Sequence, residues 1–537
     1  MFILDCTLRD GGYYNNWDFS EEVVTAYLKA ASDARIDYVE LGLRNFPQAG
    51  FLGAYAYTTE QHLNTLSLPE GPTYGVMVDA KTILKAPMSI EDAVEKLFVP
   101  AKNSKVKLVR VAAHFNEVEY SGPIVKKLKE MGYIVGYNLM QAGGKAADVI
   151  ANKAKQAKEW GVLDVLYFAD SLGNMDSAEV ERILIALRKE WNGPIGIHTH
   201  NNMGKGLDNT LSAMKNDVSW LDTTITGMGR GAGNTPTENL LAILDRETNK
   251  YDPSPIYDLV IRHFEAMQRE YGWGTNLLYF LGAQNDVHPT YIQNLLSNNH
   301  YGTDEIVGAI NYLSNLEGTM SYNGSVLESA LNFNTNSDKP TGTSEFANKF
   351  NGKEVLVIAN GNSCSRYKKS IELYIKTKKP IVLSVNLSKY IDESNIDYIV
   401  LSHNVKFLSE FEKYKSLSKP VILPKHRFNT TEMLSIEHLD IIDIGFNINS
   451  ETFSVDKHVV NSPYDLTSAY VFGILAIANP NSIKLIGFDG YEKGDTRQQE
   501  MLEIIGQYKQ LNDSTELVSL TPTEYPVTQG SIYAIHS

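Results

Sequence analysis

Short apolar segments rich in β-branched residues recur at regular intervals through the first half of the chain. Eight segments share this pattern: FILDCTL (2–8), DYVELGL (37–43), TYGVMVD (73–79), KLVRVAA (107–113), YIVGYNL (133–139), DVLYFAD (164–170), PIGIHTH (194–200) and WLDTTIT (220–226). Amphipathic stretches with helical spacing, such as residues 21–34 and 178–191, lie between them. Successive apolar segments begin roughly 25 to 35 residues apart, which is the length of one strand followed by one helix.

Eight such units within residues 1–245 predict an α/β protein built on a closed (β/α)₈ barrel, the TIM-barrel fold. An open, doubly wound parallel sheet would give a similar alternation of strands and helices. We favour the closed barrel because its ring requires eight regular repeats.

The pattern of apolar and polar residues changes twice in the second half of the chain. Residues 246–330 have a mostly helical pattern, and we expect them to extend the barrel and complete its active site. Residues 331–351 are polar and rich in Asn, Thr and Ser, which predicts a linker. Residues 352–537 return to alternating apolar strands and helices, which predicts a Rossmann-like α/β domain.

The composition narrows the range of partners. The 537 residues contain 49 Lys and Arg against 64 Asp and Glu, a formal net charge of −15, which disfavours binding to nucleic acid. Only two cysteines occur, Cys6 and Cys364, so no disulfide framework is expected. No apolar segment approaches membrane-spanning length, and we expect a cytoplasmic protein without a membrane partner.

Polar residues gather at the carboxyl ends of the predicted barrel strands, where TIM-barrel enzymes carry their active sites. They are Arg9, Asp10, Glu40, Arg44, Asp79, Arg110, His114, Asn138, Asp170, Ser171, His198 and His200. A loop that simply begins with a polar residue would account for Arg44 and Asp79. It accounts poorly for Arg110, which lies inside an apolar strand. We expect four of these residues to contact a substrate: Glu40, Arg110, Asn138 and Ser171.

The segment HTHNN (198–202) predicts a metal site. Alternate side chains on a strand point the same way, so His198 and His200 would project together at the rim. In a closed ring of eight strands, only strand eight separates strand one from strand seven, which lets Asp10 reach both imidazoles. Two imidazoles and one carboxylate with open positions bind divalent cations well. Asn234 could add a carbonyl oxygen or hold these ligands in place.

Two other interpretations of these residues stay open. An isolated pair of histidines one residue apart is often only a surface feature of an edge strand. Two histidines and one carboxylate also hold iron in non-haem oxygenases. The position of Arg9 beside the carboxylate, together with the barrel scaffold, disfavours the oxygenase chemistry.

Three motifs in the expected order resemble the signatures of a known family. DCTLRDGG (5–12), HTHNN and GMGRGAGNTPTENLL (227–241) are similar to those of the metal-dependent aldolase and carboligase barrels. That group includes 4-hydroxy-2-oxovalerate aldolase, 3-hydroxy-3-methylglutaryl-CoA lyase and isopropylmalate synthase. The resemblance implies that Asp10, His198 and His200 bind the metal, that Arg9 stabilises an enolate, and that Ser171 contacts a keto acid. The expected cofactor is a divalent metal, Mn²⁺ first, with Mg²⁺, Co²⁺ or Zn²⁺ as alternatives.

The expected function is that of a metal-dependent aldolase, which makes or breaks a carbon–carbon bond next to a 2-oxo acid such as pyruvate. Its second substrate would be an aldehyde. The general base is unassigned, because the similar aldolases carry a His soon after the Arg-Asp pair and this chain has Tyr13 and Tyr14 there. Tyr13 and His288 are the candidates, although His288 could equally begin a helix. An acyl-CoA carboligase and a non-catalytic binding scaffold remain alternatives.

The second domain has its own candidate site. VLVIANGNSCSRY (355–367) predicts a strand, a turn and a helix, and the N–H groups of such a turn can cradle a phosphate. With residues 468–491, it resembles the Rossmann-like domains of bacterial sialyltransferases and related glycan-associated proteins. The resemblance implies a nucleotide or nucleotide-linked sugar near Gly361, Ser363 and Asp489, and for the barrel a sugar-derived aldehyde from surface-polysaccharide synthesis. The alternative is an oligomerisation or docking domain, and we expect a homo-oligomer.

Overall fold

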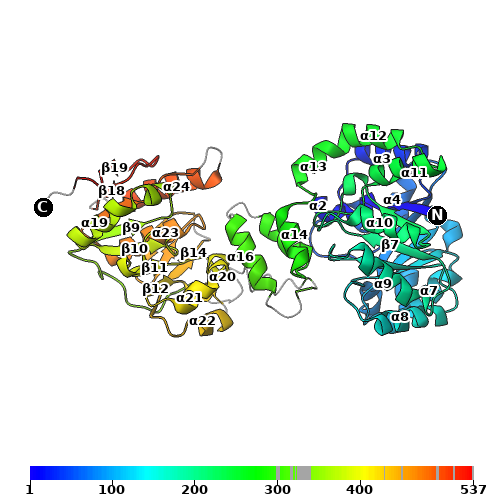
Figure 1. Ribbon diagram of the computed structural model, residues 1–537, viewed down its shortest axis with the longest axis horizontal. Coiled ribbons are helices and arrows are strands. Elements are labelled where there is room, and N and C mark those ends of the chain that lie inside the picture. The colour runs from blue at the N-terminus through cyan, green and yellow to red at the C-terminus, as the bar shows by residue number, and fades with distance from the viewer. Residues whose placement is uncertain are drawn as a thin grey trace. The chain divides into compact units, whose positions relative to one another are not determined.

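The computed structural model divides the chain into two compact units (Figure 1). It describes residues 1–297, 303–314, 319–320, 322, 340–428, 430–448, 451–491, 495–511 and 515–534. The first unit contains Met1–Ser297 and Leu313–Tyr322, and the second contains Asn298–Tyr312 and Asn323–Ser537. Within the described ranges, no helix is both long enough and apolar enough to cross a membrane.

The first unit is a closed barrel of eight parallel strands, which confirms the predicted (β/α)₈ fold. The strands are β1 (Phe2–Asp5), β2 (Tyr38–Leu43), β3 (Thr73–Asp79), β4 (Leu108–Ala113), β5 (Ile134–Leu139), β6 (Val165–Asp170), β7 (Ile195–Thr199) and β8 (Trp220–Thr223). The ring closes where β1 pairs with β8, from Phe2 opposite Trp220 to Asp5 opposite Thr223. Helices such as α8 (Ala147–Glu159) and α9 (Ser177–Arg188) lie outside the strands (Figure 1).

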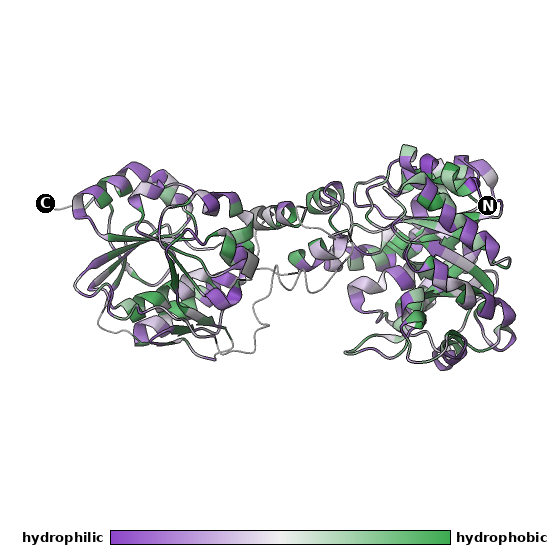
Figure 2. Ribbon diagram, turned by 90° about the horizontal axis from the view of Figure 1, so that it is seen from below, coloured by the Kyte–Doolittle hydropathy of each residue, from purple (hydrophilic) through white to green (hydrophobic). Residues whose placement is uncertain are grey.

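The barrel forms because its strands are buried on both faces and its helices bury one face each. The strands are apolar along most of their length, as the colours of Figure 2 show. Helix α3 (Glu21–Asp33) begins at Ser20, whose hydroxyl accepts from Val23 N at 3.3 Å, and buries Val24, Tyr27 and Leu28. These contacts fix the carboxyl ends of the strands at one rim.

The first strand is shorter than the sequence predicts. We expected a strand over residues 2–8, but β1 ends at Asp5 and a helical turn, α1 (Thr7–Asp10), follows it. The Asp5 carboxylate accepts from Thr7 N at 2.9 Å and from Thr7 Oγ1 at 2.6 Å, a local contact that turns the chain out of the sheet. Arg9 and Asp10 therefore lie on this helical turn and not on the strand itself.

The segment after the barrel is helical, as predicted, but it does not belong to one unit. Helices α11 (Thr237–Thr248), α12 (Ser254–Leu259), α13 (Glu265–Tyr271), α14 (Leu277–Gln284) and α15 (Pro289–Leu296) lie in the first unit. Helix α16 (Thr303–Ser314) has most of its residues in the second. In the second unit, a Cβ atom added at Gly308 would lie 2.3 Å from the Cα atom of Ser409, so the two backbones pack closely. The predicted single extension over 246–330 is thus divided.

The second unit is an α/β fold around a parallel sheet of eight strands in the order β13-β12-β11-β10-β9-β17-β18-β19. The strands are β9 (Glu354–Ile358), β10 (Ile381–Val385), β11 (Tyr398–Val400), β12 (Val421–Leu423), β13 (Ile441–Asp443), β17 (Ser482–Ile486), β18 (Leu517–Ser519) and β19 (Thr528–Gln529). Chain order runs outward from β9 in one direction and then resumes on its other side at β17. A small sheet in the order β14-β16-β15 (Gly445–Asn447, Val459–Asn461, Ser454–Asp456) was not predicted.

The part of the predicted linker (331–351) that the structure describes is folded and is not a linker. Residues 331–339 lie outside the described residues, whereas 340–351 pack into the second unit. Phe346 and Phe350 are 2% and 1% exposed in its core, and their rings lie 5.2 Å apart. Asp443 accepts from Thr343 Oγ1 at 2.8 Å. The polar composition concealed two aromatic anchors four residues apart, so this part is a folded segment.

Candidate active site

A cavity of about 280 Å³ opens at the carboxyl ends of the barrel strands. Seven of the predicted site residues line it: Arg9, Asp10, Tyr13, Asn138, Ser171, His198 and His200. They come from positions up to 191 residues apart in the sequence (9 to 200) and meet because the ring closes. The barrel rule used on the sequence therefore located the cavity.

The three predicted metal ligands all line this cavity. His198 Nε2 lies 3.3 Å from Asp10 Oδ2, and the His198 and His200 rings have centroids 5.2 Å apart. Among the described residues, the ligand atoms that lie within 4.8 Å of one another belong to Cys6, Asp10 and His198, and His200 is not in this group. The Cys6 thiol is the least suited of the three. It donates to Thr223 O at 3.5 Å and burial raises its pKa well above the usual value, so Asp10 and the imidazoles are the better ligands.

The hydrogen bonds of the two histidines leave the correct nitrogens for a metal. His198 Nδ1 donates to Asp222 Oδ2 at 2.9 Å, and His200 Nδ1 donates to the carbonyl oxygen of Arg230 at 3.3 Å. In both rings the Nε2 atom is then the one with a lone pair. A carboxylate behind a ligating histidine orients the ring and raises its basicity. These residues fit a divalent cation.

The glycine-rich loop after β8 holds the histidine strand and Asp10 together. His200 and Asn234 form an isolated antiparallel bridge, and Asn201 N donates to Gly233 O at 2.6 Å. Gly233 has φ +86°, and a Cβ there would lie 1.8 Å from the carbonyl oxygen of Gly227, so only glycine fits. Asn234 Nδ2 donates to Asp10 Oδ2. Among the described residues its Oδ1 has no hydrogen-bond partner, so it could still accept or ligate.

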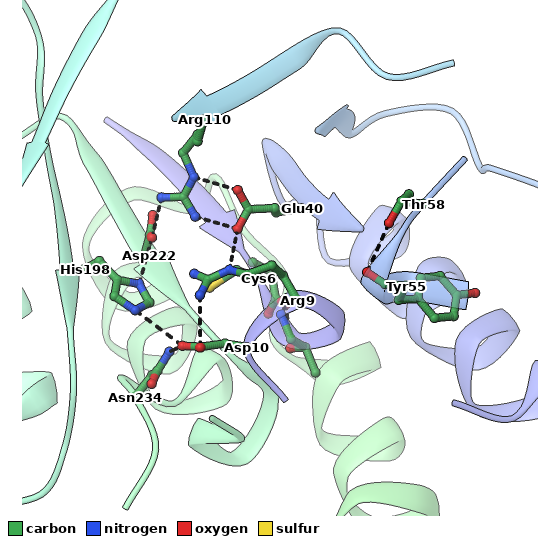
Figure 3. Close-up of polar contacts among 12 residues, drawn as sticks. Cys6, Arg9, Asp10, Glu40, Tyr55, Thr58, Arg110, His198, Asp222 and Asn234 are labelled. Atoms are coloured by element: carbon green, nitrogen blue, oxygen red, sulfur yellow. Dashed lines mark hydrogen bonds and ion pairs between the residues drawn. The ribbon is translucent and has the colours of Figure 1, made fainter. Parts of the chain in front are cut away.

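Figure 3 shows how Arg9 is fixed beside the predicted metal ligands Asp10 and His198. Its Nε donates to Glu40 Oε2 at 2.8 Å and its Nη1 donates to Asp10 Oδ1 at 2.9 Å. Its Nη2 is buried and has no hydrogen-bond partner among the residues described. A rigid guanidinium with one unused donor is suited to meet negative charge on a bound molecule.

Glu40 and Arg110 do not line the cavity, which corrects the prediction that they contact the substrate. Both side chains are fully buried beneath it. Arg110 donates to Glu40 through Nε and Nη2, each at 2.7 Å, and to Asp222 Oδ2 at 2.5 Å (Figure 3). Buried charges must be paired, so this arginine holds the two carboxylates that orient Arg9 and His198.

Replacing Arg110 with methionine should lower the free energy of unfolding of the barrel by about 3–5 kcal/mol, because two buried carboxylates lose their partner. The midpoint of the barrel transition in urea measures this loss. Arg246→Met, at an exposed position of α11, is the matched control and should leave the midpoint in place. An unchanged midpoint in Arg110→Met would contradict the proposed role of the network.

The electrostatics of the site match these roles. Burial opposes ionisation of Asp10, but the Arg9 guanidinium and the neighbouring His198 and His200 rings hold its pKa well below the usual value. Burial lowers the pKa of His200 to about 3, so this ring is neutral, as a ligand must be. Asp10 raises the pKa of Arg9 despite burial, and the guanidinium is always charged.

His288 lies outside the cavity wall, which favours the helix-start alternative over a catalytic role. It is 5% exposed and caps α15, where its Nδ1 accepts from Thr290 N at 3.3 Å. Burial lowers the pKa of its ring to about 2. The nitrogen that would take a proton is thus occupied by the helix end.

Two cavity residues were not among the predicted site residues, although the sequence placed Asp79 at the rim, where it was interpreted as the start of a loop. Arg230 lies with its guanidinium 5.3 Å from the centre of the Tyr13 ring, and its Nε is buried without a hydrogen-bond partner among the described residues. Asp79, at the end of β3, lines the same cavity with its Oδ1 buried and also lacking such a partner. The sequence contained a signal for both, since each stands at a strand's carboxyl end or in the glycine-rich motif.

Comparisons with known proteins assign the barrel half of the chain to a protein family. A model of the HMGL-like family matches residues 1–259. A 4-hydroxy-2-oxovalerate aldolase from Pelotomaculum thermopropionicum is 34% identical over 250 residues, a match that covers 45% of this chain and 70% of that protein. The chain belongs to the HMGL-like family. Its membership confirms the resemblance drawn from the three motifs and the assignment as a lyase-type enzyme.

Two further proteins are similar to the barrel half of the chain. A 4-hydroxy-2-oxovalerate aldolase from Brevibacillus brevis is 30% identical over 260 residues, which covers 46% of this chain and 70% of that protein. The crystal structure of the N-terminal domain of a Bacteroides vulgatus protein described as an aldolase is 32% identical, with a TM-score of 0.50, and covers 55% of this chain and 97% of that one. HMGL-like aldolases depend on a divalent metal, for which this chain has fitting residues. The family match ends at residue 259, so the second unit lies outside it.

Proposed function

We propose that this chain is a divalent-metal-dependent aldolase that makes or breaks the carbon–carbon bond next to a 2-oxo acid, with pyruvate as nucleophile or product. The observation that carries this proposal is the joint placement of Asp10, His198 and His200 with the Arg9 fork in one cavity. When bound by these ligands, a divalent cation would supply a Lewis acid for the keto oxygen of the substrate.

The residues of the chain supply the remaining chemistry. Arg9 stays protonated at any working pH and stabilises the negative charge that develops on the enolate oxygen as the bond breaks. Ser171 and Asn138 line the cavity and are positioned to hold the polar groups of a keto acid. Arg230 adds a second positive charge to the wall, which suits a substrate carboxylate.

Asp79 is the group on the cavity wall best suited to move the proton. In cleavage, its carboxylate takes the proton of the aldol hydroxyl, the carbon–carbon bond breaks to give the aldehyde, and the electron pair passes to the enolate carbon and oxygen. Burial and the nearby Glu117 raise the pKa of Asp79, while His114 and Lys81 oppose the shift. Desolvation raises the pKa of Tyr13, so its phenol stays protonated and can act only as a donor.

Asp79→Asn should lower kcat by about 10²–10⁴-fold and leave metal binding unchanged. Because the carboxylate of Asp79 forms only above its raised pKa, wild-type kcat/KM should rise with pH through that pKa, and the variant should lose this rise. A pH–rate profile of aldol cleavage with a matched metal titration measures both effects. A variant that keeps the wild-type profile would assign the proton to another group.

The test of the proposed function is the exchange of the methyl protons of pyruvate in D₂O with Mn²⁺ present, followed by NMR. An aldolase of this kind forms the enolate in the absence of an aldehyde, so exchange should require the protein and the metal together. The Arg9→Lys variant serves as the matched control, since it keeps the metal ligands and loses the enolate-stabilising fork. No exchange by a folded, metal-loaded protein would overturn the proposal.

Two other functions stay distinct from this one in the same assay. An acyl-CoA carboligase would release a thiol from an acyl-CoA when given a 2-oxo acid, whereas the aldolase would not. A non-catalytic scaffold would give neither signal. The use of a sugar-derived aldehyde, the preference for Mn²⁺ and assembly into a homo-oligomer remain predictions. Adducts formed from pyruvate and a panel of aldehydes, detected by mass spectrometry, would identify the second substrate.

A further inference from the structure

The second unit contains a cavity of about 430 Å³ that the barrel chemistry does not use. Its wall is built from the segments that follow β9, β10 and β17, together with the start of α23 (Thr467–Ala478) and one side of α24 (Thr496–Leu511). All of its lining residues belong to the second unit. Its volume is in the range of small-molecule sites in proteins.

The position of this cavity in the sheet is informative. Strand β9 pairs with β10 on one side and with β17 on the other, and all three are parallel. The order in which the chain adds strands to the sheet reverses at β9. In open parallel sheets, ligands bind outside the carboxyl ends of the strands at this reversal point, because the flanking loops diverge there and leave a crevice. Gly361 and Gly487, which follow the two central strands, both line the cavity.

One turn of this cavity cannot hold a phosphate, which corrects the prediction for Gly361 and Ser363. The Asp489 carboxylate accepts from Ser363 N at 2.8 Å and from Ser363 Oγ, so a negative group already occupies the turn. A Cβ at Gly361 would lie 2.7 Å from the Asp489 carboxyl carbon, which shows how closely this carboxylate is seated. Its two oxygens have four acceptor positions, and these bonds use two. The other two are suited to ligand hydroxyls.

The opposite side of the cavity carries Asp465, whose carboxylate accepts from Arg427 Nη1 at 2.7 Å, beside groups that suit an anion. Thr467 and Ser468 line it at the first turn of α23, a helix of 12 residues whose N-cap, Leu466, provides no side-chain hydrogen bond. Backbone N–H groups at such a helix start favour negative charge. Lys406 lines the same wall, and its ammonium group lies 3.9 Å from Glu410 Oε2. A phosphate there would meet a helix end and an ammonium group together.

Aromatic side chains form the third part of the wall. Phe488, Tyr491 and Tyr525 line the cavity. The Arg497 guanidinium lies 4.5 Å from the centre of the Tyr491 ring and covers one face of that ring. Aromatic rings stack on heterocyclic bases, and the energy of this contact depends little on which base is bound.

We propose that this cavity binds a nucleotide, with its sugar hydroxyls at Asp489, its phosphate at the start of α23 beside Lys406, and its base against the tyrosines. The three recognition elements lie on one continuous wall and match the three parts of one molecule. The proposal concerns the second unit alone and does not depend on the function of the barrel.

The test is calorimetric titration of the full-length protein with the four ribonucleoside 5′-diphosphates, the matching nucleosides and inorganic phosphate. At least one diphosphate should bind about tenfold or more tightly than its nucleoside and than phosphate. Lys406→Gln should weaken this binding by about tenfold. Lys413→Gln is the matched control, because Lys413 also pairs with Glu410 but does not line the cavity, and it should bind as wild type.

A second variant guards against loss of folding. Ser468→Asp places a carboxylate in the first turn of α23, which favours the helix but repels a phosphate. It should lose diphosphate binding while keeping its melting temperature. Absence of nucleotide binding at about 1 mM, or wild-type binding by both cavity variants, would overturn the proposal. Phosphate alone binding as tightly as the diphosphates would reassign the cavity to a simple anion.

Discussion

Asp10→Asn should lose the bound divalent metal and the aldolase activity together. The amide carries no charge, so the site keeps two neutral imidazoles and loses its anionic ligand. Arg9 and His198 also lose the carboxylate that they contact. We expect metal affinity to fall by more than about 100-fold, and turnover to fall with it to background. Metal content by mass spectrometry and pyruvate proton exchange measure the two losses on one preparation.

The matched control for this variant is Asp18→Asn, which makes the same chemical change at an exposed position close in sequence. It should keep full metal content and full activity. If Asp10→Asn retained stoichiometric metal at limiting concentration, the metal ligands would have to be other residues, and Cys6 would be the first to examine because it lies in the same cluster. Melting curves confirm that both variants are folded.

Arg9→Lys should keep the metal and lose rate. A lysine has one point charge in place of a planar fork, so it cannot contact Glu40, Asp10 and a substrate oxygen at the same time. Loss of one preorganised donor at a developing oxyanion lowers kcat by about 10²–10³-fold. The effect should appear in kcat with metal affinity near that of the wild type, which separates this role from that of Asp10.

Arg246→Lys is the matched substitution on an exposed face of α11 and should leave both quantities unchanged. Full turnover in Arg9→Lys would show that a point charge suffices at this position. In that case stabilisation of the enolate would rest on the metal and on Arg230, whose Nε has no hydrogen-bond partner among the described residues. The Arg230→Lys variant would then be the next to measure.

The barrel could be predicted from the sequence because its strands are buried on both faces. Such strands read as continuous apolar runs, and their bounds were predicted to within one or two residues for β2 through β7. The misjudged ends were β1 and β8, where FILDCTL and WLDTTIT continue the apolar pattern into a turn. The Asp5 side chain that redirects the chain acts through a hydrogen bond, which periodicity does not register.

The cavity at the rim could be predicted because the residues that line it lie next to the ends of strands. The rim rule does not say which way a side chain points, and this is why Glu40 and Arg110 were misplaced. Arg110 lies in the middle of β4 and projects into the closed ring, where it meets Asp222 from across the barrel. That partnership joins residues 112 positions apart and has no local signature. Asp222 was therefore missed altogether.

In the second unit the alternation of strands and helices was predicted, but the role of the turn after β9 was not. The turn after β9 looks like a phosphate cradle in sequence, and only the folded chain reveals the Asp489 carboxylate within it. The segment 340–351 shows the opposite error, because its polar residues outnumber the two phenylalanines that fix it in the core. In both cases a few long-range contacts outweigh the local composition.

The charges collected under the barrel rim have a consequence for the order in which ligands arrive. The network of Figure 3 contains two guanidinium groups and three carboxylates, which are Arg9, Arg110, Asp10, Glu40 and Asp222. These five groups alone sum to a formal charge of −1, which favours a divalent cation over an anion next to them. A divalent cation reverses that sign, and the carboxylate of the incoming acid then brings the whole assembly to electrical neutrality. We therefore expect the metal to bind before the acid, so that binding of the acid should depend on the metal.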